Sequence, residues 1–122
     1  MTVHRLFGAE VSLYTGKVRA YLRYKDIPYR EVLATRDVYK TIIVPRTGVR
    51  FIPVLISDRD VAIQDSTAII DHLEERYEAG CVYPDGALQR RVALLLEVYA
   101  DEWLVVPAST IAGTSPKTVP LP

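Results

Sequence analysis

The chain has 122 residues, of which 49% are hydrophobic and 25% are charged, a composition typical of one soluble globular domain. Fifteen Lys and Arg residues balance fifteen Asp and Glu residues, so we expect neither a nucleic acid nor a membrane surface as a partner. No signal-peptide pattern opens the sequence, and no apolar run reaches the roughly 18 residues that a membrane span needs. A single cysteine, Cys81, excludes an internal disulfide and favours a reducing, cytoplasmic location.

The first 78 residues predict alternating strands and helices. Apolar spacing and turn residues indicate strands at 2–8, 28–34, 51–57 and 60–64 and helices at 13–25, 36–43 and 65–77. This β-α-β-α-β-β-α order belongs to the α/β class. Its β-α-β opening favours parallel pairing, whereas the polar turn at 58–60 makes the third and fourth strands an antiparallel hairpin. We therefore expect a mixed four-stranded sheet with helices on both faces.

The remaining residues predict a separate helical part. Residues 79–86 are rich in turn formers and are expected to be a linker after a first domain at 1–78. Residues 87–107 form the longest and most apolar helical pattern. Its apolar stripe includes Leu88, Val92, Leu95, Tyr99 and Trp103. Since one neighbouring helix cannot cover so wide a stripe, we expect a homodimer. Residues 108–122 show no periodicity and are expected to be a disordered tail.

Ser12 stands directly before the first predicted helix, and its position allows two interpretations. The hydroxyl can cap the helix by accepting a hydrogen bond from a backbone N–H of the first turn. The same hydroxyl, together with the positive end of the helix dipole, can stabilise an anion such as a thiolate. Position alone leaves both roles open.

Asp65 and Ser66 open the third predicted helix and present the same choice. Asp65 is a favourable cap, while the pair, with the N–H groups of the first turn, can also receive a carboxylate and an ammonium side by side. Pro53 interrupts an apolar strand pattern, although proline cannot donate to a strand ladder. A cis bond at Pro53 would leave the N–H and C=O of Ile52 available to an extended peptide.

Other chemistry-bearing residues carry weaker signals. His4 and His72 lack metal-ligand spacing, so we expect no metal. Cys81 has no neighbouring histidine and is interpreted as an incidental thiol. Arg46 and Arg50 flank a glycine in a loop, where they are either solvated or hold an acidic ligand.

The segments "FIPV" and "QDSTAIIDHLE", in this order of elements, resemble the N-terminal, thioredoxin-like domain of glutathione transferases. The resemblance covers residues 2–78, and 87–107 looks like the first helix of the all-helical second domain of that family. The proline paired with the acid-serine signature is its most specific part. Many relatives have a proline after the serine at the first helix, where this chain has Leu13, and Tyr14 is an alternative hydroxyl.

The resemblance implies a role for each matching residue. Pro53 matches the cis-proline of the family, and Ile52 would offer its backbone to the cysteinyl part of glutathione. Asp65 and Ser66 match the pair that holds the γ-glutamyl carboxylate and ammonium. Ser12 matches the residue that activates the thiol for attack on an electrophile, which the sequence does not identify. Glutathione would thus be a co-substrate, and the absence of cysteine at positions 12 and 15 excludes a dithiol reaction.

The resemblance breaks off after Pro107, where the second domain of the family would continue. We therefore expect a truncated or frameshifted relative, an expectation that resequencing the gene would test. Two functions of different classes follow. The chain is either a transferase that adds glutathione to an electrophile, or a non-catalytic module that binds glutathione weakly or only a partner through 87–107.

Overall fold

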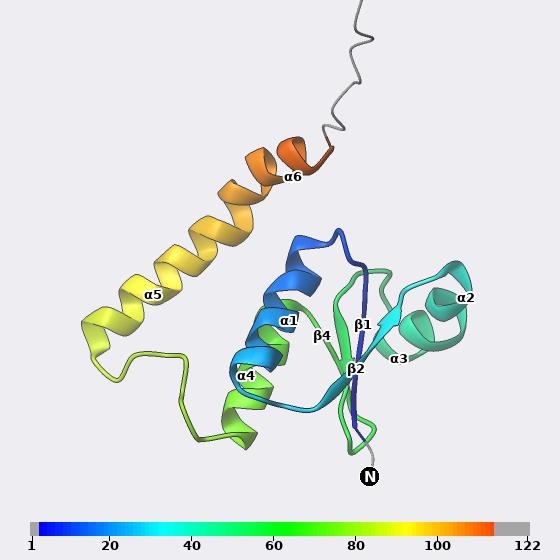
Figure 1. The fold of residues 1–122 in the computed structure, drawn as a ribbon, viewed down its shortest axis with the longest axis horizontal. Helices are drawn as coiled ribbons and strands as arrows, with labels where there is room; N and C mark the ends of the chain where they lie inside the picture. Colours follow the sequence, from blue (N-terminus) through cyan, green and yellow to red (C-terminus); the bar gives the residue numbers. More distant parts are fainter. Residues whose placement is uncertain (1–2, 114–122) are drawn as a thin grey trace, which may run out of the picture. The chain divides into compact units, whose positions relative to one another are not determined.

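The structure is a computed structural model that describes residues 3–113. The chain forms two compact units, residues 1–82 and residues 83–122. The strands of the first unit are β1 (His4–Gly8), β2 (Tyr29–Leu33), β3 (Val54–Ile56) and β4 (Ala62–Gln64). Its helical segments are α1 (Leu13–Tyr24), α2 (Arg36–Val38), the π-helical turn η1 (Tyr39–Ile43), α3 (Val44–Thr47) and α4 (Ser66–Arg76). The β-α-β-α-β-β-α order predicted from the sequence is confirmed (Figure 1).

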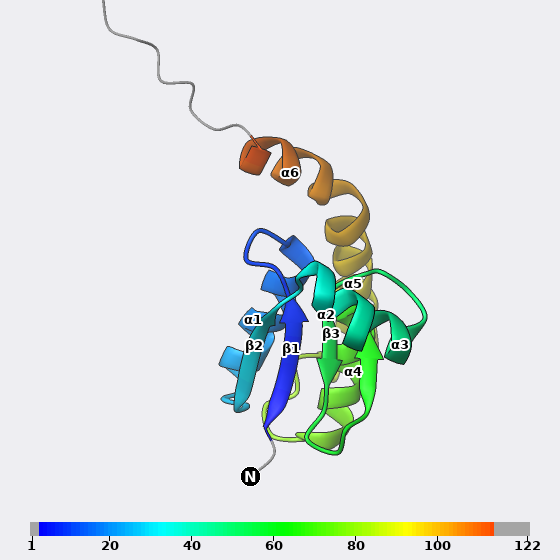
Figure 2. The ribbon, with the colours of Figure 1, turned by 90° about the vertical axis from the view of Figure 1, so that its right-hand side faces the viewer.

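The sheet has the order β2-β1-β3-β4 and mixes two kinds of pairing (Figure 2). β1 and β2 are parallel, as a crossover through α1 requires. β3 lies antiparallel to β1 and to β4, so the hairpin is also confirmed. In the register, Phe7 faces Val54, which in turn faces Gln64. The mixed four-stranded sheet is therefore as expected.

Helices cover both faces of the sheet, and each face has its own core. On one face, Phe7, Val54 and Ile56 pack with Ile43 of η1. Side chains alternate along a strand, so the register pair Leu6 and Leu55 points to the opposite face, which α1 and α4 cover (Figure 1). The fully buried residues of α1 and α4 close this second layer: Val18, Leu22, Ile69 and Leu73.

At two prolines, the bounds of the observed element differ from those that the sequence pattern predicts. β3 starts only at Val54, because Pro53 has no N–H to give to the ladder. The second helical region does not stop before Pro45 but runs on to Thr47. η1 changes the hydrogen-bond register directly before α3, and Pro45 then lies in the first turn of α3, where a missing N–H costs little.

The second unit is helical in its described part, from α5 (Ala87–Tyr99) through the π-helical turn η2 (Ala100–Leu104) to α6 (Val105–Gly113). The sequence pattern predicts that the helix ends at residue 107 and that a tail begins at 108. The helix instead continues to Gly113. Pro107 again follows a π-helical turn and lies in the first turn of the next α-helix. Residues 114–122 of the expected tail lie outside the described residues.

The boundary of the first unit lies at Val82 rather than at residue 78. Hydrogen bonds explain the difference, since the carbonyls of Ala79 and Gly80 accept bonds from Lys25 of α1. The backbone N–H of Val82 donates to Glu74 of α4. These contacts attach the first half of the expected linker to the first unit.

Candidate functional site

The predicted site residues meet at one edge of the sheet. The register places the end of β1, the start of β3 and the end of β4 side by side, because Phe7, Val54 and Gln64 are consecutive partners. Ser12 follows β1, the Ile52–Pro53 bond precedes β3, and Asp65 with Ser66 follows β4. The topology thus brings together residues that are more than fifty positions apart in the sequence.

Ser12 is the N-cap of α1. Its Oγ accepts a hydrogen bond from the backbone N–H of Thr15 at 3.2 Å, which is the structural role expected for this position. A hydroxyl that accepts through a lone pair keeps its own O–H for a further partner. Capping of α1 and donation to an anion at the positive end of its dipole are therefore compatible roles for Ser12.

Gly8, at the end of β1, allows the start of α1 to approach the strand closely. A Cβ added to Gly8 would lie 2.3 Å from Cγ2 and 2.4 Å from Oγ1 of Thr15, so only glycine fits there. Thr15 is fully buried, and its Oγ1 accepts a bond from the N–H of Ala9 at 3.4 Å. Gly8 and Thr15 thus determine where Ser12 lies, a contribution that no sequence signal indicated.

The peptide bond between Ile52 and Pro53 is cis in the structure. Pro53 is fully buried, whereas Ile52 is half-buried. The ladder between β1 and β3 begins with the pair Phe7 and Val54, so the backbone of Ile52 lies just beyond it. An extended segment placed along this edge would meet the N–H and C=O of Ile52 first.

Asp65 and Ser66 form the entry to α4. Asp65 is the N-cap, and its Oδ2 accepts a bond from the N–H of Ala68 at 3.3 Å. The backbone φ of Asp65 is 85°, a value that residues other than glycine rarely adopt. Ser66 is 1% exposed, and its Oγ has no hydrogen-bond partner among the described residues. A buried hydroxyl without a partner is costly, so a ligand group that reached the helix start would satisfy this Oγ.

A small cavity of about 300 Å³ is lined by Tyr39, Lys40, Val44 and Arg50. Arg50 precedes Ile52 by two residues, so this cavity adjoins the same edge. Within the described residues neither Lys40 nor Arg50 has an ion-pair partner, which suits them to an anion. Sequence reasoning singled out Arg50 but missed Lys40, because nothing local relates η1 to the loop at 50. Arg46, the other candidate, instead pairs with Asp60 at 2.8 Å.

The remaining candidates stand apart from this edge. His4 is buried and its Nε2 lies 2.9 Å from the hydroxyl of Tyr77, and burial lowers its pKa. Cys81 is an exposed free thiol in the segment after α4. In the part of the chain that the structure describes, no group of three or more His, Cys, Asp or Glu residues could hold a metal ion. No helix within residues 3–113 is long and apolar enough to cross a membrane.

Comparisons with known proteins agree with the fold described above. Residues 6–80 match the family model described as the glutathione S-transferase N-terminal domain. A sequence comparison with curated proteins finds no match. Among solved structures, the chain is 25% identical to a glutathione S-transferase from Rhodospirillum rubrum, with a TM-score of 0.75 over 82% of this chain and 46% of that one.

Two further solved structures show the same extent of similarity. The Tau class glutathione S-transferase of mango, Mangifera indica, is 26% identical, with a TM-score of 0.76 over 93% of this chain and 52% of that one. A glutathione S-transferase from Methylobacterium radiotolerans, in complex with glutathione sulfonate, is 26% identical, with a TM-score of 0.73 over 82% and 47%. The chain therefore spans about half the length of these relatives. With a family match over more than half of its residues, the chain belongs to the glutathione S-transferase family and carries its thioredoxin-like N-terminal domain.

Proposed function

We propose that this chain binds glutathione at the edge formed by Ser12, Ile52–Pro53 and Asp65–Ser66, and that Ser12 activates the thiol. The observation that carries the proposal is the buried Oγ of Ser66, which has no partner among the described residues and lies at the positive end of α4 beside the carboxylate of Asp65. An α-amino acid group has complementary charges. Its carboxylate would accept bonds from Ser66 and the helix N-terminus, and its ammonium would pair with Asp65.

The other parts of glutathione match neighbouring groups along the same edge. The cysteinyl backbone would pair with the N–H and C=O of Ile52, which lie beyond the β1–β3 ladder. The second carboxylate, at the glycine end, would lie by Lys40 and Arg50, the two cations of the small cavity. The ammonium and the glycine-end carboxylate then have partners of opposite charge, and the γ-glutamyl carboxylate has a hydroxyl and a helix N-terminus.

The thiol would lie at the start of α1, next to Ser12. A thiolate there gains a hydrogen bond from the hydroxyl, while the helix dipole favours its negative charge. Both effects lower the pKa of the thiol and raise the fraction of thiolate at neutral pH. The thiolate sulfur then attacks an electrophilic centre, forms a thioether and displaces the leaving group or adds across the acceptor bond. The electrophile remains unassigned, and we infer a cytoplasmic setting, in which glutathione is held reduced.

Calorimetric titration of the full chain with glutathione tests the binding site. Asp65→Asn keeps a side chain that caps helices well but removes the charge that pairs with the ammonium. We expect this variant to bind glutathione about tenfold more weakly or worse. Glu75→Gln removes an equal charge from an exposed position of the same helix and should leave the affinity unchanged. An absence of binding heat from a chain that circular dichroism shows to be folded would contradict the proposal.

The second candidate function is that of a non-catalytic module that self-associates through the helical unit. The observation in its favour is a stripe of exposed apolar side chains at spacings of three and four residues along α5: Leu88, Val92, Leu95 and Tyr99. Trp103 of η2 continues the stripe and is 69% exposed. A homodimer would cover this surface. Such a module predicts self-association without turnover of any electrophile.

A further inference from the structure

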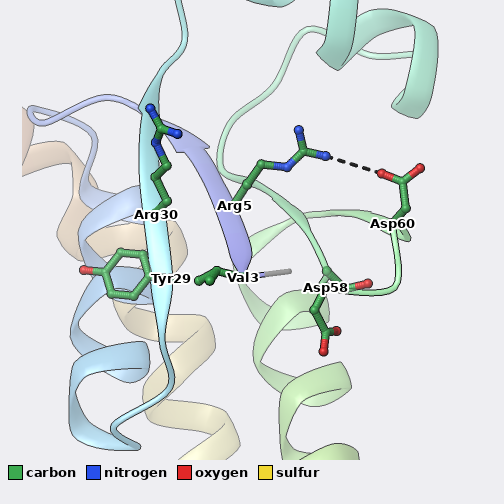
Figure 3. Close-up of a pocket in the computed structure, with 7 residues that line it drawn as sticks. Val3, Arg5, Tyr29, Arg30, Asp58 and Asp60 are labelled. Carbon is green, nitrogen blue, oxygen red and sulfur yellow. Dashed lines mark hydrogen bonds and ion pairs between the residues drawn. The ribbon is translucent and has the colours of Figure 1, made fainter. Parts of the chain in front are cut away.

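A larger pocket lies at the opposite edge of the sheet from the site described above. It has a volume of about 460 Å³ and is lined by Val3, Arg5, Tyr29, Arg30, Ser57, Asp58 and Asp60 (Figure 3). These residues come from the starts of β1 and β2 and from the turn between β3 and β4. A volume of this size is in the range that small-molecule sites occupy.

Two arginines stand side by side in this pocket. Arg5 and Arg30 are direct partners in the parallel register of β1 and β2, so their side chains leave the sheet on the same face. Figure 3 shows both rising from neighbouring strands. Like charges directly opposite each other on a sheet are destabilising, and an anion placed between them would relieve the repulsion.

The carboxylates of the pocket are already engaged by arginines that do not line it. Asp58 forms a two-point ion pair with Arg76 of α4. Asp60 accepts two bonds from Arg46, at 2.9 Å and 2.8 Å. The contact from Arg5 to Asp60 is longer, at 3.3 Å, and single.

The charge of the cluster follows from these pairs. Asp58 is matched by Arg76 and Asp60 by Arg46, so the positive charges of Arg5 and Arg30 remain in the lining, and the single 3.3 Å contact from Arg5 to Asp60 offsets one of them only in part. Within the described residues Arg30 makes neither a hydrogen bond nor an ion pair. The surplus positive charge therefore lies at the adjacent register positions of Arg5 on β1 and Arg30 on β2.

We propose that this pocket binds a phosphate monoester. The phosphate group of such an ester carries about two negative charges above its second pKa of about 6, which matches the surplus, and its oxygens suit the forked donors of arginine. The hydroxyl of Ser57 adds a further polar group, and Val3 and Tyr29 offer apolar surface to the esterified part. The site shares no residue with the proposed glutathione site, so neither proposal depends on the other.

Backbone amide NMR of the full chain tests the proposal, with phenyl phosphate as the probe at a pH above about 7, where the ester is a dianion. We expect shift changes that saturate and are centred on residues 3–5, 29–30 and 57–60. The same titration is repeated with ribose 5-phosphate and with inorganic phosphate. If phenyl phosphate binds more tightly than ribose 5-phosphate, the natural ligand is assigned as an aromatic phosphate ester; if ribose 5-phosphate binds more tightly, it is assigned as a sugar phosphate. Either result supports the site. Inorganic phosphate binding as tightly as both esters would overturn the assignment to an ester.

Variants distinguish binding at this pocket from nonspecific attraction of anions to the protein surface. Arg30→Gln removes one forked donor and should weaken binding of phenyl phosphate about tenfold or more. Arg30→Lys keeps the positive charge but lacks the forked donors of the guanidinium. Its affinity for phenyl phosphate should lie between those of Arg30→Gln and the parent chain. Arg36→Gln removes the same charge from an exposed position of α2 outside the pocket and should change the affinity less than about twofold. Equal weakening by Arg30→Gln and Arg36→Gln, or shift changes confined to Ser12 and Asp65, would overturn the proposal.

Discussion

The ammonium of Lys25 lies 2.9 Å from the carboxylate of Glu74, and only 3% and 9% of the two side chains are exposed. The ammonium also donates to the carbonyls of Tyr77 and Ala79, each at 2.8 Å, and of Gly80 at 3.2 Å. A residue at the end of α1 thus holds the segment that follows α4. The pair joins the two helices that cover the same face of the sheet.

Replacing Lys25 should strongly destabilise the first unit. Lys25→Met removes the buried ammonium and leaves the carboxylate of Glu74 without its charge partner, which typically costs about 3–5 kcal/mol. Lys40→Met, at an exposed position of η1, is the matched control and should change stability by less than about 0.5 kcal/mol. Urea denaturation followed by circular dichroism measures both. Equal midpoints for the two variants would show that the pair contributes nothing.

The same network makes stability depend on pH. Burial raises the pKa of Glu74, but hydrogen bonds from Cys81, Tyr21 and Lys25 and from the N–H of Val82 outweigh burial and lower this pKa from 4.5 to about 2. A carboxyl group whose pKa is lower in the folded state stabilises that state fully above its ordinary pKa. This contribution declines as the pH falls from 4.5 and is lost at about 2.

Glu74→Gln cannot titrate, so its stability deficit should shrink as the pH is lowered. We expect the difference in urea midpoint between the parent chain and Glu74→Gln to be larger near pH ~6 than near pH ~3. Asp58, whose pKa is held at about 2 by hydrogen bonding to Arg76, titrates in the same range in both proteins and cancels from the difference. A deficit that stays constant over this range would contradict the assigned pKa shift.

Two glycines near the start of α1 should respond to alanine in opposite directions. Gly8→Ala would drive a Cβ into the buried side chain of Thr15 and should cost about 1–3 kcal/mol, because backbone and helix must shift. Gly16→Ala meets nothing within 4 Å and should stabilise α1 by up to about 1 kcal/mol. Thermal unfolding of both variants tests this. Adding Thr15→Ala to Gly8→Ala should recover part of the loss, whereas strictly additive effects would argue against the contact.

Variants of Ser12 should separate helix capping from thiol activation. Ser12→Ala removes both roles: it should cost about 1 kcal/mol of stability and raise the pKa of the thiol of bound glutathione. Ser12→Asp keeps a good cap but places a negative charge beside the thiol, so only the thiol pKa should change. Ultraviolet absorbance of the thiolate, titrated against pH, measures the second effect. A bound thiol with the same pKa in all three proteins would exclude activation by Ser12.

The apolar stripe of α5 should govern self-association. Leu95 is 70% exposed in the middle of the stripe, and Leu95→Gln should weaken a homodimer by about tenfold, as expected for an apolar residue central to an interface. Arg91→Gln lies on the same helix and should have little effect. Sedimentation of both variants over a range of concentrations measures this. A parent chain that stays monomeric at high concentration would remove the basis for the dimer.

Local patterns of the sequence were sufficient to predict the class and order of the first unit. Helix starts at Ser12 and Asp65, alternation along the strands and the polar turn at 58–60 depend on neighbours within a few residues, so they can be recognised without the tertiary structure. The resemblance to glutathione transferases rested on the same short segments, and the family match over residues 6–80 confirms it. The candidate site residues were therefore proposed from local sequence, while their common location was not derivable from spacing alone.

Only the tertiary structure determined which distant side chains meet. Ser66 is buried without a partner because α4 packs on the sheet, and Lys25 reaches Glu74 because α1 and α4 share one face. Arg5 stands beside Arg30 through a strand register that no composition reveals. Such contacts depend on how twenty-five to fifty intervening residues fold, and a one-residue shift in register would turn every side chain of a strand to the other face. Sequence periodicity identifies the helices and strands. Packing between these elements determines which side chains form the ion pairs, line the cavities and make up the proposed sites.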